Sequence, residues 1–138
     1  MQNINPALLR EDVDGADELY REHILDHYRH PHHAGAMEDS THRAREANPL
    51  CGDEIEIFLR LGESGTAENV SFVGHGCAIS QAAISMLTDW AQGKNKEELA
   101  AAGEKLIWEL LGVRVSPTRE KCALLGLRAL KKALIHIQ

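Results

Sequence analysis

The sequence has few aromatic residues, few cysteines and no long apolar run. Only 4% of its 138 residues are aromatic, so aliphatic side chains must fill the core, and surfaces that stack nucleobases are disfavoured. The net charge of −6 and the pI near 5.7 argue against binding to a phosphate backbone. We therefore expect no nucleic-acid partner.

No apolar run approaches the length of about 18 residues that a membrane span needs. The first residues also lack the basic region and apolar stretch of a secretory signal. The sequence thus predicts no membrane partner and a cytoplasmic location. With 43% apolar and 26% charged residues, the chain suits one globular domain. We place that domain at residues 14–138, after a flexible N-terminal arm at 1–13.

The periodicity of the apolar residues predicts an α+β fold, in which a small antiparallel sheet has helices packed on one face. A helix is expected from Asp14, where Asp14 or Asp17 can cap it, to Pro31. The segment Gly74-His75-Gly76 is expected to break the strand that precedes it. The remaining predicted elements are strands at 41–47, 54–61 and 68–73, and helices at 77–92, 96–111 and from 117 to about 137.

The three cysteines each stand at a boundary between predicted elements. Cys51 lies in a turn beside Gly52, Cys77 follows Gly76 at a helix start, and Cys122 lies in the opening turns of the last helix. Helix N-termini present unpaired N–H groups that favour thiolate over thiol. The alternative is that each is a small buried hydrophobe. The spacing C-x25-C-x44-C is no zinc-finger pattern, so the boundary positions carry the prediction of a shared metal or iron–sulfur site.

Three thiolates leave a tetrahedral metal centre one ligand short. Asp53 lies two residues after Cys51 and could complete the shell, or could instead stabilise the turn. His75 is a second candidate for the fourth ligand. Lys121 is a poor ligand while protonated, but a cation next to Cys122 would favour the thiolate of that cysteine.

Five of the eight histidines lie between His23 and His33. Such a tract could bind metal. We interpret it instead as a solvated helix end, because His27 and His30 lack the spacing and acidic partners that are typical of zinc sites.

Four segments together resemble the U-type iron–sulfur assembly proteins, which are IscU, SufU and the N-terminal domain of NifU. The segments are LYREHILDHYRHPHHAG, NPLCGDEIEI, GHGCAISQAAISMLTDW and SPTREKCALLGLRALKKAL. By resemblance, Cys51, Cys77 and Cys122 match the three cysteines of the family, and Asp53 matches the aspartate of its C-G-D motif. The resemblance implies a three-stranded antiparallel sheet with helices on one face. It also implies a cysteine desulfurase partner, recipient apo iron–sulfur proteins, and a site that holds zinc or a transient [2Fe-2S] cluster.

Within the family, the motifs are most similar to SufU. NPLCGDEI, GHGCAISQ and KCALLG are SufU-like, and Lys121 stands where IscU-type proteins carry histidine. SPTRE replaces the L-P-P-V-K motif through which IscU-type proteins engage a dedicated Hsp70 chaperone, so that partner is not expected. The chain nevertheless lacks the insertion that SufU-type proteins usually carry between the second and third cysteines.

The sequence thus predicts a protein that accepts sulfur from a cysteine desulfurase and serves as a scaffold for cluster assembly and transfer. Cys122 is the expected sulfur acceptor, and Cys51, Asp53, Cys77 and Cys122 are the expected ligands. One alternative is a zinc-dependent sulfurtransferase that relays sulfur without building the cluster. The other is a structural zinc-binding domain with inert thiolates. The sequence thus favours a scaffold or sulfur-acceptor protein over a conventional enzyme, and a sulfurtransferase if the protein is SufU-like.

Overall fold

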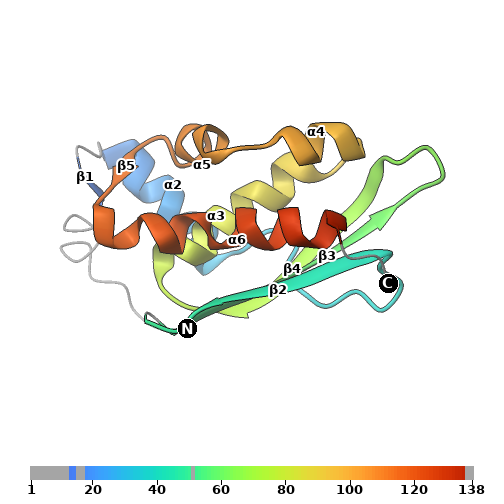
Figure 1. Ribbon diagram of the computed structural model, residues 1–138. Helices are drawn as coiled ribbons and strands as arrows, with labels where there is room; N and C mark the ends of the chain where they lie inside the picture. Colours follow the sequence, from blue (N-terminus) through green and yellow to red (C-terminus); the bar gives the residue numbers. More distant parts are fainter. Residues whose placement is uncertain (1–12, 15–17, 51, 136–138) are drawn as a thin grey trace.

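The computed structural model describes residues 13–14, 18–50 and 52–135. In chain order the elements are β1 (Val13–Asp14), α2 (Glu18–Arg29), β2 (His42–Asn48), β3 (Asp53–Leu61), β4 (Ala67–His75), α3 (Ala78–Ala91), α4 (Lys96–Ala101), α5 (Glu104–Leu111), β5 (Arg114–Val115) and α6 (Pro117–Ile135). Strands β2, β3 and β4 form an antiparallel sheet in that order, and helices cover one face of it (Figure 1). The predicted α+β class and its three-stranded sheet are confirmed.

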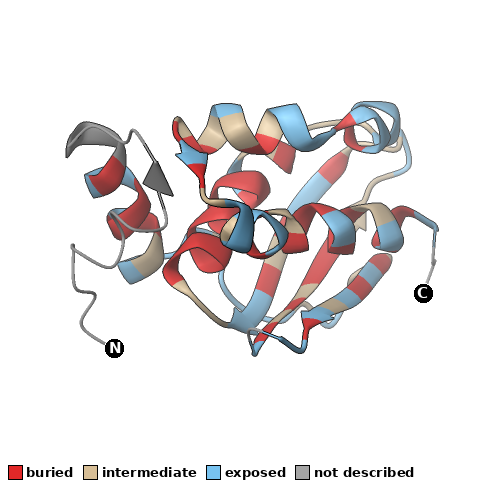
Figure 2. Ribbon diagram, turned by 60° about the vertical axis from the view of Figure 1, so that its left-hand side comes forward, coloured by how far each residue is buried: buried red, intermediate tan, exposed pale blue. Residues whose placement is uncertain are grey.

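The core lies between this sheet and helices α3 and α6. Strand β3 buries Ile55, Ile57 and Leu59 wholly on one face as predicted, whereas Phe58 on the other face is also buried and Leu61 is only partly buried. Helix α3 is buried on nearly all sides because it packs against α2, α6 and β4. Helix α6 lies across β2 and β3, and buried residues concentrate where these layers meet (Figure 2). None of the helices described is long and apolar enough to cross a membrane.

A second, two-stranded sheet was not predicted. Strand β1 pairs with β5 through Val13 with Val115 and Asp14 with Arg114. The first helix therefore begins at Glu18 and not at Asp14, whose backbone is in a strand. The alternative cap, Asp17, lies outside the described residues. A two-residue pairing leaves no periodic pattern in the sequence, which is why only the tertiary structure reveals it.

The single helix predicted at 96–111 is two helices. Asn95 caps α4 in a capping box with Glu98, and α4 ends at Ala101. Helix α5 begins after Gly103, which has the extended backbone of an N-cap residue. The apolar pattern runs through this break because both helices bury residues in the same core, so periodicity alone did not separate them.

The pH dependence of stability follows in part from His42 at the start of β2. His42 is buried, its Nδ1 is 2.9 Å from Thr41 Oγ1, and its Nε2 is buried without a hydrogen-bond partner among the described residues. Burial, and secondarily the charge of Lys96, lowers the pKa of His42 from 6.5. The folded protein therefore takes up fewer protons than the unfolded chain as the pH falls below 6.5.

We expect the free energy of unfolding to decrease below about pH 6.5, by at most about 1.4 kcal/mol per pH unit for this one proton. His42→Gln should flatten that decrease in urea titrations between pH 7 and pH 5. His27, whose pKa burial also lowers, accounts for part of the slope that remains. His30→Gln, at an exposed position, is the control. Parallel curves for His42→Gln and the wild type would contradict the assignment.

Candidate metal centre

The register of the sheet brings the start of β3 beside the end of β4. Asp53 is opposite Asn48 in β2, and the next residue, Glu54, is opposite His75 in β4. Cys77 follows His75 by two residues, so it lies next to Asp53. The strand break predicted at Gly74-His75-Gly76 comes later than its first residue, because β4 continues through Gly74 and ends at His75.

Asp53 and Cys77 are in direct contact. Asp53 is 1% exposed, its Oδ1 accepts a hydrogen bond from the Cys77 backbone N–H at 3.0 Å, and its Oδ2 is 3.8 Å from Cys77 Sγ. Cys77 is also the N-cap of α3, where its Sγ accepts a hydrogen bond from the Ser80 backbone N–H at 3.5 Å. The sulfur thus lies where the unpaired N–H groups of the helix point.

Helix α6 brings Cys122 to the same place. Cys122 is wholly buried, and one ligand atom from each of Asp53, Cys77 and Cys122 lies within 4.8 Å of the other two. Gly126, one turn further along α6, makes this approach possible. A Cβ at Gly126 would lie 2.6 Å from Ile84 Cδ1 on α3, so only a residue without a side chain lets the two helices come so close.

The three donors fit a bound metal. Zinc bonds to sulfur and oxygen are about 2.0–2.3 Å long, so tetrahedral ligand atoms lie roughly 3.3–3.8 Å apart, and a small inward movement reaches that spacing. Thiolates with one carboxylate suit zinc or iron. The fourth predicted ligand, Cys51, lies outside the described residues, so its role stays a prediction.

The side chains of His75 and Lys121 do not point toward the three donors. The side chain of His75 is 71% exposed, with Nε2 3.4 Å from Glu54 Oε1, and His75 is not in the group of close ligand atoms. Lys121 is exposed whereas Cys122 is buried, because successive helical residues point about 100° apart. The Lys121 ammonium therefore projects toward solvent and Cys122 toward the core.

Gly76, the residue directly before Cys77, lies against the carboxylate of Asp53. A Cβ at Gly76 would lie 2.3 Å from Asp53 Oδ1 and 2.8 Å from Ser80 Oγ. The glycine thus makes room for the side chain of Asp53. The roles of Ser80 and Gly126 were missed, since neither forms a recognisable motif with a cysteine.

Gly76→Ala should disrupt the centre. Its φ of +150° is unfavourable for alanine, and the new methyl group would collide with Asp53. We expect a stability loss of about 2–4 kcal/mol and at least a 10-fold weaker metal affinity, measured by urea unfolding and competitive chelation. Gly35→Ala is the matched control, because Gly35 has a φ of +137° and nothing within 4 Å of the added Cβ. Equal effects of the two substitutions would show that backbone strain alone matters.

The fold and the three converging donors define a small α+β domain with a candidate cysteine–aspartate metal centre. The chain belongs to the NifU-like N-terminal domain family, whose model matches residues 19–138. The predicted U-type family is thereby confirmed.

Two relatives of nearly equal identity to this chain carry different functional names. The iron-sulfur cluster assembly scaffold protein IscU of Streptococcus pyogenes serotype M1 is 36% identical over 135 residues, covering 86% of this chain and 84% of the relative. The zinc-dependent sulfurtransferase SufU of Bacillus subtilis (strain 168) is 35% identical over 137 residues, covering 86% and 90%.

Two solved structures are similar to this chain in fold and in sequence. A protein of the SUF system from Fervidobacterium islandicum AW-1, described as a putative iron-sulfur cluster assembly scaffold, superimposes with a TM-score of 0.68. It is 28% identical in sequence, and the match covers 82% of this chain and 94% of the solved chain. The crystal structure of a hypothetical protein superimposes with a TM-score of 0.74 at 33% identity. The match covers 88% of this chain and 100% of the solved chain.

Proposed function

We propose that this protein accepts sulfur from a cysteine desulfurase and serves as a scaffold on which an iron–sulfur cluster is assembled for transfer to apo proteins. The observation that carries the proposal is the convergence of Asp53, Cys77 and Cys122, from three separate elements, within 4.8 Å. Relatives at 35–36% identity are named as a scaffold and a sulfurtransferase. Cys51 joins these residues as a ligand in the proposal.

Sulfur acceptance is a thiol–persulfide exchange at Cys122. The thiolate attacks the terminal sulfur of the desulfurase persulfide, a new S–S bond forms, and the desulfurase cysteine leaves as a thiolate. The exchange involves no net oxidation. Conversion of that sulfur to sulfide takes two electrons, which an external electron donor must supply.

The burial of the two described cysteines sets a condition on this exchange. Cys122 is wholly buried, while Cys77 is partly exposed. A desulfurase persulfide must reach Cys122 Sγ, so the centre has to open before sulfur is transferred. Asp53 is linked to Cys77 by hydrogen bonds, and a carboxylate is a weaker ligand for iron than a fourth thiolate, which suits a centre that must release its product.

Anaerobic reconstitution tests the scaffold. The protein is incubated with a cysteine desulfurase, cysteine, ferrous iron and a reductant, then isolated and analysed for iron and acid-labile sulfide. We expect both to remain with the protein in near-equal amounts and to move to an added apo ferredoxin. Cys77→Ser should retain neither. Persulfide on the protein without acid-labile sulfide would overturn scaffolding.

A zinc-dependent sulfur relay is the second candidate, supported by the 35% identity to the Bacillus SufU and by the SufU-like Lys121. The donor set accommodates zinc as readily as iron. In a relay, zinc would increase desulfurase turnover, and chelation would abolish the increase. In a scaffold, zinc would compete with iron and inhibit assembly. Desulfurase assays with and without stoichiometric zinc separate the two.

A further inference from the structure

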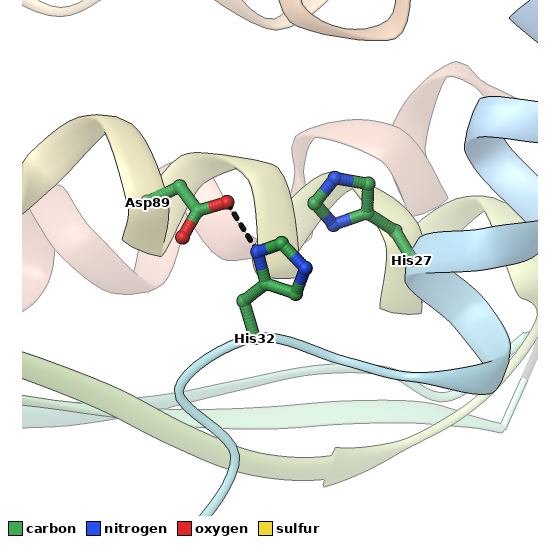
Figure 3. A group of neighbouring side chains, drawn as sticks. All are labelled: His27, His32 and Asp89. Atoms are coloured by element: carbon green, nitrogen blue, oxygen red, sulfur yellow. Dashed lines mark hydrogen bonds and ion pairs between the residues drawn. The ribbon is translucent and has the colours of Figure 1, made fainter.

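A second group of metal-binding side chains lies toward the other end of α3. His27 from the last turn of α2, His32 from the following loop, and Asp89 from α3 each place one ligand atom within 4.8 Å of the other two (Figure 3). Asp89 follows Cys77 by 12 residues, roughly 18 Å along the helix axis. The group is therefore spatially separate from the cysteine centre.

His27 is not the solvated residue that the sequence predicted. It is 5% exposed, and its ring centroid is 4.4 Å from that of His32. The interpretation of the whole tract as a solvated helix end is wrong for this residue. It failed because the hydrogen-bond partner of His27, Ser85, is 58 residues away in sequence.

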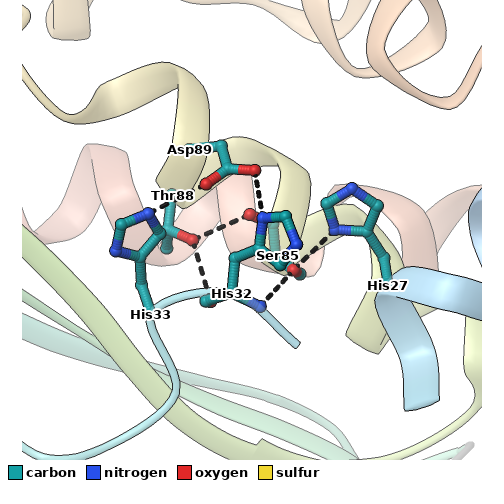
Figure 4. Close-up of polar contacts among 6 residues, drawn as sticks. All are labelled: His27, His32, His33, Ser85, Thr88 and Asp89. Carbon is teal, nitrogen blue, oxygen red and sulfur yellow. Dashed lines mark hydrogen bonds and ion pairs between the residues drawn. The ribbon is translucent and has the colours of Figure 1, made fainter. Parts of the chain in front are cut away.

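The carboxylate of Asp89 is hydrogen-bonded to the imidazole rings of His32 and His33. Its Oδ2 is 2.5 Å from His32 Nδ1, and its Oδ1 is 2.8 Å from His33 Nε2 (Figure 4). Both histidines come from consecutive positions, although consecutive side chains of an extended chain point to opposite sides. Asp89 is thereby fixed in one orientation, as a carboxylate ligand requires.

The backbone of His33 explains how the two rings converge. His33 has a φ of +59°, and it is the one non-glycine residue with positive φ in the described part of the chain. Its carbonyl oxygen accepts a hydrogen bond from the Phe72 N–H at 3.0 Å, and the Gly35 N–H donates to the Phe72 carbonyl at 2.7 Å. Strand β4 thus holds the loop in a conformation that is unfavourable for histidine.

Ser85 positions the other two ligands. Its Oγ is 2.7 Å from His27 Nδ1 and accepts the backbone N–H of His32 at 2.8 Å (Figure 4). Ser85 is wholly buried and lies one helical turn before Asp89, on the same side of α3. A serine that orients both histidines and a histidine that orients the carboxylate are the outer-shell contacts that metal sites use to fix their ligands.

We propose that His27, His32 and Asp89 form a second metal site, which binds a divalent transition-metal ion such as Zn²⁺ or Fe²⁺. Two imidazoles and a carboxylate are a donor set for zinc and for non-haem ferrous iron, and they leave coordination positions open. The side chains of His32 and Asp89 are 45% and 40% exposed, so an ion reaches the site from solvent while His27 anchors it from inside. His33 and Ser85 are positioning residues.

Anaerobic titration with Co²⁺, followed by absorption spectroscopy and equilibrium dialysis, tests this proposal. Wild-type protein should bind two ions, one with a thiolate-to-cobalt charge-transfer band and one without. Because Cys77→Ser removes a ligand of the cysteine centre only, it should lose the band and keep the second ion. Failure of the cysteine centre and failure of the second site are thus distinguishable.

His32→Ala and Asp89→Asn should each lower the affinity for the ion without the charge-transfer band by at least about 100-fold, because even outer-shell changes lower metal affinity about 10- to 100-fold. Both variants should keep the charge-transfer band of the other ion. His33→Ala should lower the affinity of the same site by about 10- to 100-fold. His30→Ala is the matched control, since it removes an exposed imidazole from the same segment and should leave both ions bound. A wild-type protein that binds no ion other than the one with the charge-transfer band, or a His30→Ala loss equal to that of His32→Ala, would overturn the proposal.

Discussion

Cys122→Ser is expected to lower the rate of persulfide acceptance from a cysteine desulfurase by at least about 100-fold. A serine hydroxyl stays protonated near neutral pH and cannot hold sulfane sulfur, whereas a thiolate attacks a persulfide readily. The measurement is mass-spectrometric detection of persulfide on the alkylated protein after incubation with desulfurase and cysteine. Circular dichroism verifies that the variant, altered at a wholly buried position, is folded.

Two comparisons make the acceptor assignment specific. Trp108→Phe, on α5, should leave acceptance at the wild-type rate. Cys77→Ser removes a ligand from the same centre but keeps the proposed acceptor, so acceptance at Cys122 should persist. If Cys122→Ser accepts sulfur at the wild-type rate, the acceptor is another cysteine, and the partly exposed Cys77 becomes the better candidate of the two described.

Metal content has to be measured beside persulfide labelling, because Cys122 has two proposed roles. A ligand substitution that releases the metal also changes the reactivity of the remaining thiols. Removing zinc from the wild-type protein before the assay isolates the nucleophilic role. Metal-free wild type should accept sulfur and metal-free Cys122→Ser should not.

Removal of the metal is expected to lower the melting temperature by roughly 10 °C. An ion present at about 1,000 times its dissociation constant adds about 4 kcal/mol to the stability of the folded state, and a domain of this size loses a few degrees per kcal/mol. The physical reason is that one ion joins the start of β3, the N-cap of α3 and the first turns of α6, which are distant in sequence. Calorimetry before and after verified chelation measures the shift.

Ligand variants show which centre carries that shift. Cys77→Ser should melt at nearly the same temperature with or without zinc, apart from any contribution of the proposed histidine site. His32→Ala should retain most of the zinc-dependent shift, because it leaves the cysteine centre intact. An unchanged melting temperature after complete metal removal from the wild type would contradict the stabilising role of the centre.

Much of the fold was predictable from local sequence patterns. The alternation of Ile55, Ile57 and Leu59 marks a strand with one buried face, and Pro117 marks the start of α6. Elements without a periodic pattern were not predictable. The β1–β5 pairing joins distant segments of the chain, and the apolar pattern runs through the break before Gly103, so periodicity revealed neither.

The candidate site divides in the same way. The residue types at element boundaries identified Asp53, Cys77 and Cys122, because thiols and carboxylates in turns and at helix starts are chemically distinctive wherever the chain folds. Their distances were decided by the sheet register and by the close approach of α6 to α3 at Gly126. The sheet register and the approach of the two helices both depend on packing over the whole domain.

The histidines show the limit of local reasoning most clearly. The sequence by itself determined the kind of donors and their crowding between His23 and His33, but not which ones face the protein interior. Only the tertiary structure decided that His27 is buried and that His32 and His33 meet at Asp89. The physical reason is that ligand geometry depends on where α3 lies relative to α2 and β4, and burial of the shared core sets that position.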